Sequence, residues 1–136
     1  MQISRPDEQY GNGDTSFKAA GGEAGVRKLV NDFYDQMEQL PEAKIIREMH
    51  SADLTESRDK LHLFLCGWLG GPRLYQEKYG GMSIPKAHSH LKIGEHESKT
   101  WILCMQKALD KQAYKESFKR YLITELRRPA EACRTL

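Results

Sequence analysis

Residues 84–101, IPKAHSHLKIGEHESKTW, hold three of the five histidines of this 136-residue chain and one of its two tryptophans. Pro85 disfavours helix at the residue before it, and Gly94, with a glutamate three residues later, has the spacing of a helix start. His88 and His90 lie between these two signals, and neutral imidazole is a common metal ligand. The stretch therefore marks both a helix boundary and the first candidate for a functional site.

Helical periodicity flanks this stretch on both sides, and no segment alternates as a strand does. Four segments carry apolar residues at the three- and four-residue spacing of one buried helix face. The sequence therefore predicts an all-α domain. The apolar positions are Val26, Leu29, Val30, Phe33 and Met37; Leu61, Phe64, Leu65, Trp68 and Leu69; Trp101, Cys104, Met105, Ala108 and Leu109; and Tyr114, Phe118, Tyr121, Leu122 and Leu126.

Local signals set the expected helix boundaries. Asp53, with Glu56 three residues later, resembles a capping box and is expected to start the second of these helices. A brief helical turn is expected over residues 45–49, and Pro129 is expected to end the last helix. Residues 70–88 lack periodicity, and we expect an irregular but ordered connection there.

The length of 136 residues suits a single domain that buries its core without disulfides. Residues 1–15 offer little to bury, so we expect a flexible N-terminal extension there and one domain over residues 16–136. The 21 basic and 19 acidic residues nearly cancel, which argues against a nucleic-acid partner.

The three cysteines, Cys66, Cys104 and Cys133, are far apart and show no Cys-x-x-Cys spacing. This pattern argues against a disulfide framework and indicates reduced thiols, with Cys66 and Cys104 expected in the core and Cys133 expected to be a reactive thiol. No stretch approaches the roughly 18 apolar residues of a membrane span, and the first residues have no apolar core. We therefore expect a soluble cytoplasmic protein without a membrane partner.

The remaining histidines are weighed by position. His62 falls on the polar side of its predicted helix and His96 in a charged first turn, so both are expected to be solvated. His88 and His90 lie in the constrained segment. A zinc site could combine these two with His96 or a nearby glutamate, because catalytic zinc takes three protein ligands, but the spacing is loose.

Taken together, five landmarks resemble the group II truncated haemoglobins, and the likeness covers residues 15–126. Each landmark is weak alone, but their order and spacing are specific. They are GGEAGV at residues 21–26, Phe33-Tyr34, LFLCGWLGGP at residues 63–72, His88 ahead of Leu91 and Ile93-Gly94, and WILCM at residues 101–105.

The resemblance implies a two-over-two helical sandwich around haem b, iron protoporphyrin IX. The family's proximal histidine corresponds to His88, and its distal polar residues to Tyr34, His50 and Trp101. No Cys-x-x-Cys-His motif is present, so we expect the haem to be held non-covalently.

The resemblance also implies an apolar haem pocket whose walls exclude water. Many relatives carry arginine directly before the proximal histidine, where this chain has Ala87. Lys86, Arg73 and Tyr75 are therefore the candidates for contacts to the haem propionates. The expected pocket residues are Met49, Ser57, Leu61, Phe64, Leu65, Leu91 and Ile93.

The implied function is reversible binding of dioxygen and of related diatomic ligands, nitric oxide and carbon monoxide. Bound dioxygen acquires negative charge, so donors aimed at it slow its release and suit bulk oxygen transport poorly. An enzymatic alternative is a nitric oxide dioxygenase or a peroxidase-like reaction with peroxide, served by an unidentified reductase. A further alternative is a haem-free helical metal-binding domain. A monomer or a weak homodimer is expected.

Overall fold

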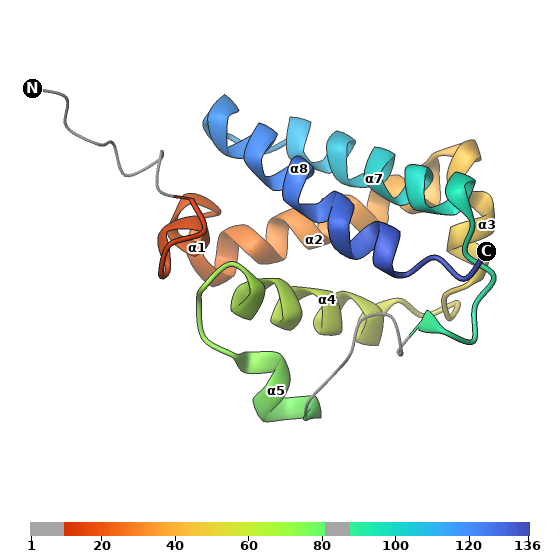
Figure 1. Cartoon of the computed structure of the whole chain (residues 1–136), viewed down its shortest axis with the longest axis horizontal. Helices are drawn as coiled ribbons and strands as arrows, with labels where there is room; N and C mark the ends of the chain where they lie inside the picture. The colour runs from red at the N-terminus through yellow and green to blue at the C-terminus, as the bar shows by residue number, and fades with distance from the viewer. Residues whose placement is uncertain (1–9, 81–87) are drawn as a thin grey trace, which may run out of the picture.

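The computed structural model describes residues 10–80 and 88–136, and every regular element in these two ranges is helical (Figure 1). The predicted all-α class is therefore confirmed. The elements are α1 (Thr15–Ala19), α2 (Gly22–Gln39), the 3-10 turn η2 (Pro41–Ala43), α3 (Lys44–Glu48), α4 (Thr55–Trp68), α5 (Leu74–Tyr79), α7 (Glu95–Asp110) and α8 (Glu116–Ala132).

Helix α2 is the central element of the fold. It packs against both α4 and α7, and α7 packs in turn against α8, so that the pair α2 and α4 lies against the pair α7 and α8 (Figure 1). Val26, Leu29, Phe33 and Met37 on its predicted apolar face are at most 1 % exposed. Burying each such side chain contributes roughly 1.5–3 kcal/mol. The predicted two-over-two sandwich is confirmed.

The corner between α1 and α2 depends on close backbone approach. Gly21 has φ +88° and precedes α2 in the left-handed conformation that glycine adopts readily. A Cβ on Gly25 would lie 1.9 Å from the carbonyl oxygen of Ala20. The hydroxyl of Tyr114 donates to that same oxygen at 3.0 Å, which ties the corner to the turn before α8.

Residues 1–9 of the expected N-terminal extension lie outside the described residues. Tyr10 packs its ring on Phe118 and Tyr121, with both centroid distances 5.2 Å. Its hydroxyl lies 2.9 Å from the hydroxyl of Ser117. The part of the extension that the structure describes is therefore held against α8 by an aromatic contact.

The start of α4 differs in detail from the predicted capping box. The helix begins at Thr55 without a side-chain cap, and Asp53 Oδ1 accepts hydrogen bonds from the backbone N–H of Thr55 at 2.9 Å and from its hydroxyl at 2.7 Å. The prediction located the helix start but assigned the wrong acceptor geometry. At α7 the predicted start is confirmed, since the N–H of Gly94 donates to Glu97 Oε1 at 2.7 Å.

The expected irregular connection over residues 70–88 contains the short helix α5, so that prediction was wrong for residues 74–79. Contacts with α4 fix this helix. Lys78 Nζ and the Tyr79 hydroxyl both lie 2.8 Å from Asp59 Oδ2. A helix of six residues has little intrinsic stability, so tertiary contacts decide whether it forms. The sequence carries no periodic signal for it.

The predicted end of the last helix at Pro129 was also wrong, because α8 continues through this proline to Ala132. Proline inside a helix lacks one hydrogen bond, at a cost of about 3 kcal/mol. Leu126 and Ala130, on either side of Pro129, are both buried. Burial of this last turn offsets the local cost.

His62, which we expected to be solvated, is only 3 % exposed. Its ring lies beside the buried Cys66, with Nε2 3.9 Å from Sγ, and its Nδ1 has no hydrogen-bond partner among the described residues. The charged neighbours that affect its pKa include Glu23 and Arg27 of α2. The side of α4 that looks polar in sequence is thus covered. Cys66 and Cys104 are fully buried, as predicted.

Within the described ranges, no helix combines the length and the apolar composition needed to cross a membrane.

Gly25→Ala should lower the free energy of unfolding by about 2 kcal/mol, because the new methyl group overlaps a backbone carbonyl that cannot move aside. Urea unfolding followed by far-UV circular dichroism measures the change. Ala24→Ser, at an exposed position in the same turn, is the control and should leave stability nearly unchanged. Equal stabilities for the two variants would contradict the close approach.

His62→Leu should make stability less dependent on pH. Burial lowers the pKa of His62 below its usual value of 6.5, so the folded state holds the ring neutral. The unfolded chain binds the extra proton as the pH falls below about 6.5, and stability declines with acidification down to the folded pKa. Unfolding free energies measured at pH values from about 5 to 7.5 should fall less steeply in the variant. Exposed His96→Gln is the control, and an unchanged slope in His62→Leu would contradict the assignment.

Candidate functional site

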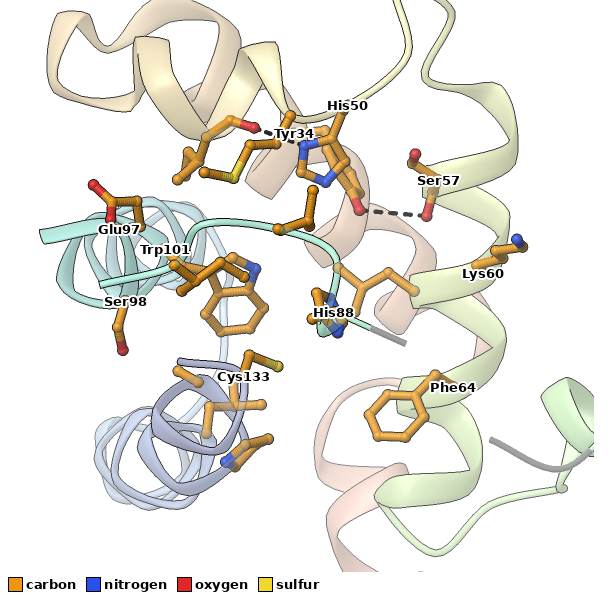
Figure 2. A pocket seen from close by; sticks show the side chains of 18 of the residues that line it. Tyr34, His50, Ser57, Lys60, Phe64, His88, Glu97, Ser98, Trp101 and Cys133 are labelled. Atoms are coloured by element: carbon orange, nitrogen blue, oxygen red, sulfur yellow. Dashed lines mark hydrogen bonds between the residues drawn. The ribbon is translucent and has the colours of Figure 1, made fainter. Parts of the chain in front are cut away.

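A cavity of about 450 Å³ lies between the two helix pairs (Figure 2). Small-molecule sites in proteins commonly have volumes of about 300–1,000 Å³. The walls come from α2, α3, α4, α5, residues 88–93, α7 and the C-terminal end of α8. Segments far apart in the sequence therefore meet around one space.

The structure brings most of the predicted site residues to this cavity. Arg73 is exposed and does not line it, and Lys86 lies outside the described residues. The predicted residues that do line it are Tyr34, Met49, His50, Ser57, Leu61, Phe64, Leu65, Tyr75, His88, Leu91, Ile93 and Trp101.

Several lining residues were not predicted. Leu126, Pro129, Ala130 and Cys133 repeat at the spacing of one face of α8, so continuing that helix through Pro129 would have identified them. The expected reactivity of Cys133 is also not supported, since burial raises the pKa of its thiol. The other unpredicted lining residues are Ile46, Ser51, Lys60, Glu97 and Ser98, and His90, a candidate ligand of the alternative zinc site, also lines the cavity.

Tyr34 projects from α2 into the cavity and is 5 % exposed. Its hydroxyl donates to the carbonyl oxygen of Ser57 on α4 at 3.4 Å, which is a long and therefore weak hydrogen bond. Burial raises the pKa of Tyr34 to about 12, and the positive charge of Arg58 opposes that shift. The phenol is therefore protonated near neutral pH and can donate a hydrogen bond into the cavity.

Arg58 holds α4 against α2 beside this tyrosine. Its guanidinium donates to the carbonyl oxygen of Asn31 at 3.1 Å, to the side-chain oxygen of Asn31 at 3.2 Å and to Asp35 at 3.0 Å. The guanidinium carbon lies 5.6 Å from the centroid of the Tyr34 ring. These contacts bracket Tyr34 along α2 and limit the movement of its ring.

His50 follows α3 and contacts Tyr34 edge to face, with ring centroids 5.7 Å apart. Its Nδ1 lies 2.8 Å from the carbonyl oxygen of Ile46 (Figure 2). A carbonyl only accepts, so Nδ1 carries the proton and Nε2 of the neutral ring is an acceptor. Burial and the nearby charge of Arg47 lower the pKa of His50 and favour this neutral form, although the hydrogen bond to Ile46 opposes the shift.

This geometry bears on the expected role of His50 as a donor into the pocket. Its single N–H is directed at a backbone carbonyl, so the ring offers the cavity a proton acceptor instead. Tyr34 and Trp101 are left as the neutral donors among the three predicted distal residues. The sequence could not reveal this because the tautomer depends on which backbone atom the ring meets.

Trp101 is carried by α7, in the second turn of that helix. Its indole ring packs on Phe33 of α2, with centroids 4.9 Å apart, and is partly exposed to the cavity. Phe33 and Tyr34 are neighbours in sequence, but their side chains project in different directions from α2. Phe33 is fully buried against α7, whereas Tyr34 reaches the cavity.

His88 lies at the start of the described segment before α7 and is half-buried. The N–H of Leu91 donates to its carbonyl oxygen at 3.0 Å, which closes a turn. Figure 2 shows its ring between Trp101 on one side and α4 on the other, with Tyr34 and His50 at the far end of the cavity. One imidazole and the polar groups of Tyr34, His50 and Trp101 thus line the same largely apolar cavity.

The alternative zinc site is not assembled. In the parts of the chain that the structure describes, no three His, Cys, Asp or Glu side chains gather closely enough to hold a metal ion. His88 and His90 line the cavity, whereas His96 is exposed on α7 and does not.

Comparison with known proteins agrees with the fold and the cavity. A model of the bacterial-like globin family matches residues 15–134. The group 2 truncated haemoglobin YjbI of Bacillus subtilis is 30 % identical over 105 residues, which cover 77 % of each chain.

Solved structures give the same result. The cold-adapted truncated haemoglobin of the Antarctic bacterium Pseudoalteromonas haloplanktis TAC125 superposes with a TM-score of 0.86 and 31 % identity, over 89 % of this chain and 98 % of that one. The group II 2-on-2 haemoglobin of Agrobacterium tumefaciens superposes with a TM-score of 0.83 and 35 % identity, over 88 % and 92 % of the two chains. The chain therefore belongs to the bacterial-like globins and, within them, to the group II truncated haemoglobins.

Proposed function

We propose that this chain binds haem b non-covalently through His88 and, in that form, reversibly binds dioxygen and related diatomic ligands. The observation that carries the proposal is a single cavity, walled largely by apolar side chains, that is lined by the His88 imidazole together with Tyr34, His50 and Trp101. Globin-family membership supports a haem-based function. The related truncated haemoglobin of Bacillus subtilis is described as oxygen-avid.

The residues of the cavity fit a flat apolar cofactor with one axial ligand. Phe64 and Leu65 of α4 form one wall, and Leu91 and Ile93 lie on the side of His88. His88 would hold the haem iron through its imidazole, and the bound haem would supply a metal that takes a diatomic ligand. The apolar walls exclude water from that face, and excluding water strengthens the polar contacts made there.

Tyr34 and Trp101 are the donors that we assign to the ligand. The Tyr34 phenol is protonated near neutral pH because burial raises its pKa to about 12, and the Trp101 indole has a permanent N–H. The bond from Tyr34 to the Ser57 carbonyl is long at 3.4 Å, so little is lost when the hydroxyl turns toward a ligand. Each new hydrogen bond contributes about 1–1.5 kcal/mol and slows ligand release roughly tenfold.

Polar groups at the cavity edge suit the two carboxylates of haem b. Lys60 of α4 and Tyr75 of α5 both line the cavity. Lys60 Nζ also lies 3.0 Å from the carboxylate of Glu56 on the exposed side of α4, so this ammonium group can pair with a carboxylate at the solvent-exposed edge of the cavity. We assign propionate contacts to Lys60 and Tyr75, retain Lys86 as a candidate, and leave out Arg73 because it lies away from the cavity.

A second function, a nitric oxide dioxygenase or a peroxidase-like reaction with peroxide, is favoured by one observation. Neutral His50 lies beside Tyr34 with an acceptor nitrogen available, and a proton acceptor within a buried site supports acid–base chemistry. Steady-state turnover of nitric oxide or peroxide with a reductase separates this function from simple binding. An absent porphyrin band in the purified protein would instead favour a haem-free helical domain.

We further propose a cytoplasmic protein, monomeric or weakly dimeric, that relies on an as yet unidentified reductase to keep the iron ferrous. Its three cysteines are free of disulfides, and burial raises the pKa of each thiol, which makes them less reactive. These properties fit a reducing compartment.

His88→Ala should weaken haem binding strongly, because it removes the axial nitrogen while leaving the apolar walls intact. Titration of haem into the apoprotein, followed by the porphyrin absorption band, measures the affinity. His90→Ala, two residues away at the same cavity, is the matched control and should bind haem normally. Loss of binding in the His90 variant alone would identify His90 as the ligand and overturn the assignment.

Tyr34→Phe and Trp101→Phe should each increase the oxygen dissociation rate constant about tenfold, because each removes one donor and keeps an aromatic ring in place. Stopped-flow replacement of oxygen by carbon monoxide gives the rate. Tyr79→Phe, which removes a hydroxyl bonded to Asp59 outside the cavity, is the control and should leave the rate unchanged. Unaltered rates in both distal variants would mean that neither residue contacts the ligand.

A further inference from the structure

The residues that follow α8 return to the segment that carries His88. Four hydrogen bonds join the two. The N–H groups of Thr135 and Leu136 donate to the carbonyl oxygen of Ile93 at 2.8 and 3.1 Å. The N–H of Ile93 donates to the Thr135 hydroxyl oxygen at 2.9 Å, and that hydroxyl donates to the carbonyl oxygen of Leu91 at 2.6 Å. Figure 1 shows the C-terminus beside the segment that leads into α7.

These bonds supply partners to a stretch of backbone that has no helix to satisfy it. Residues 91–94 form neither helix nor strand, and unpaired buried backbone groups are costly. Thr135 satisfies three of them, namely the carbonyl oxygens of Leu91 and Ile93 and the N–H of Ile93. Thr135 alone thus supplies the hydrogen-bond partners that a neighbouring strand supplies in a sheet.

Both segments joined by these hydrogen bonds also contribute side chains to the cavity. Leu91 and Ile93 line the cavity, and the turn from His88 to Leu91 is closed by a backbone hydrogen bond of 3.0 Å. In the C-terminal segment that makes the other half of the contact, Cys133 also lines the cavity. Thr135 is therefore two residues from Cys133 in the cavity wall. It is connected to His88 through Leu91, whose carbonyl oxygen accepts from the Thr135 hydroxyl and whose N–H donates to the carbonyl oxygen of His88.

We propose that Thr135 is a positioning residue for the His88 side of the cavity. Its hydroxyl fixes residues 91–93 against the end of α8, and through the turn closed by Leu91 it fixes the orientation of the His88 ring. The part of this inference that concerns haem rests on the proposed function. The part that concerns the backbone does not, because all four hydrogen bonds join protein atoms to one another.

The test compares Thr135→Val with Thr135→Ser. Valine has the shape of threonine without the hydroxyl, so it deletes the bonds to Leu91 and Ile93 while leaving the backbone N–H of residue 135 in place. Serine keeps the hydroxyl and should restore both bonds. Because residue 135 is exposed and follows the last helix, both variants should fold, which far-UV circular dichroism verifies.

Two measurements are made on each variant. Amide hydrogen exchange at Ile93 in the apoprotein should accelerate about tenfold in Thr135→Val, as expected for losing one net hydrogen bond, and should stay near wild type in Thr135→Ser. The rate of haem loss to an excess of a haem-scavenging apoglobin should likewise rise about tenfold in the valine variant and recover in the serine variant. The iron–histidine stretching band of the ferrous protein should shift or broaden only in Thr135→Val.

The outcomes separate the inference from the proposed function. Suppose that His88→Ala loses haem, whereas Thr135→Val shows wild-type rates both of amide hydrogen exchange at Ile93 and of haem loss. The positioning role is then wrong and the haem proposal stands. Faster exchange at Ile93 with unchanged haem loss and an unchanged stretching band reduces Thr135 to a purely structural role and also overturns the inference. Haem retention by His88→Ala overturns the axial assignment, and the positioning of that ring falls with it.

Discussion

Packing of α2 against two helices at once is the constraint from which the rest of the structure follows. One face of α2 is buried at Val26, Leu29 and Phe33, and the helix contacts both α4 and α7. All three of these helices contribute side chains to the cavity of about 450 Å³. The corner before α2 depends on the absence of a side chain at Gly25, where the carbonyl of Ala20 approaches closely.

The cavity combines an apolar wall with a few polar groups whose protonation is set by burial. Burial raises the pKa of Tyr34 to about 12 and lowers that of His50, so both side chains are neutral near pH 7. The backbone carbonyl of Ile46 fixes the tautomer of His50 and leaves an acceptor toward the cavity. Arg58, anchored to Asn31 and Asp35, places its guanidinium carbon 5.6 Å from the centroid of the Tyr34 ring. A preorganised set of neutral donors and one acceptor suits a small polar ligand better than a charged one.

Much of the site was predicted through the family resemblance, whose landmarks lie on strongly periodic helices or beside clear breakers. Tyr34 follows the buried stripe of α2, Trp101 continues that of α7, and His88 lies between Pro85 and Gly94. The failures share a physical cause. His62 is buried by α2, and α8 runs through Pro129 because Leu126 and Ala130 are buried around it. In both cases a contact from a distant segment outweighs a local preference, and a single sequence does not state which segments meet.

By itself, the sequence determined the all-α class, the approximate extent of the four long helices and the family, because amphipathic periodicity and ordered landmarks are local properties. Only the tertiary structure decided which faces are covered, which way a ring nitrogen points, and which backbone groups are paired across long separations. The tautomer of His50 depends on the carbonyl of Ile46, and the backbone around Ile93 is completed by Thr135, 42 positions later. Such contacts depend on distances in space, and packing sets those distances only once the helices have assembled.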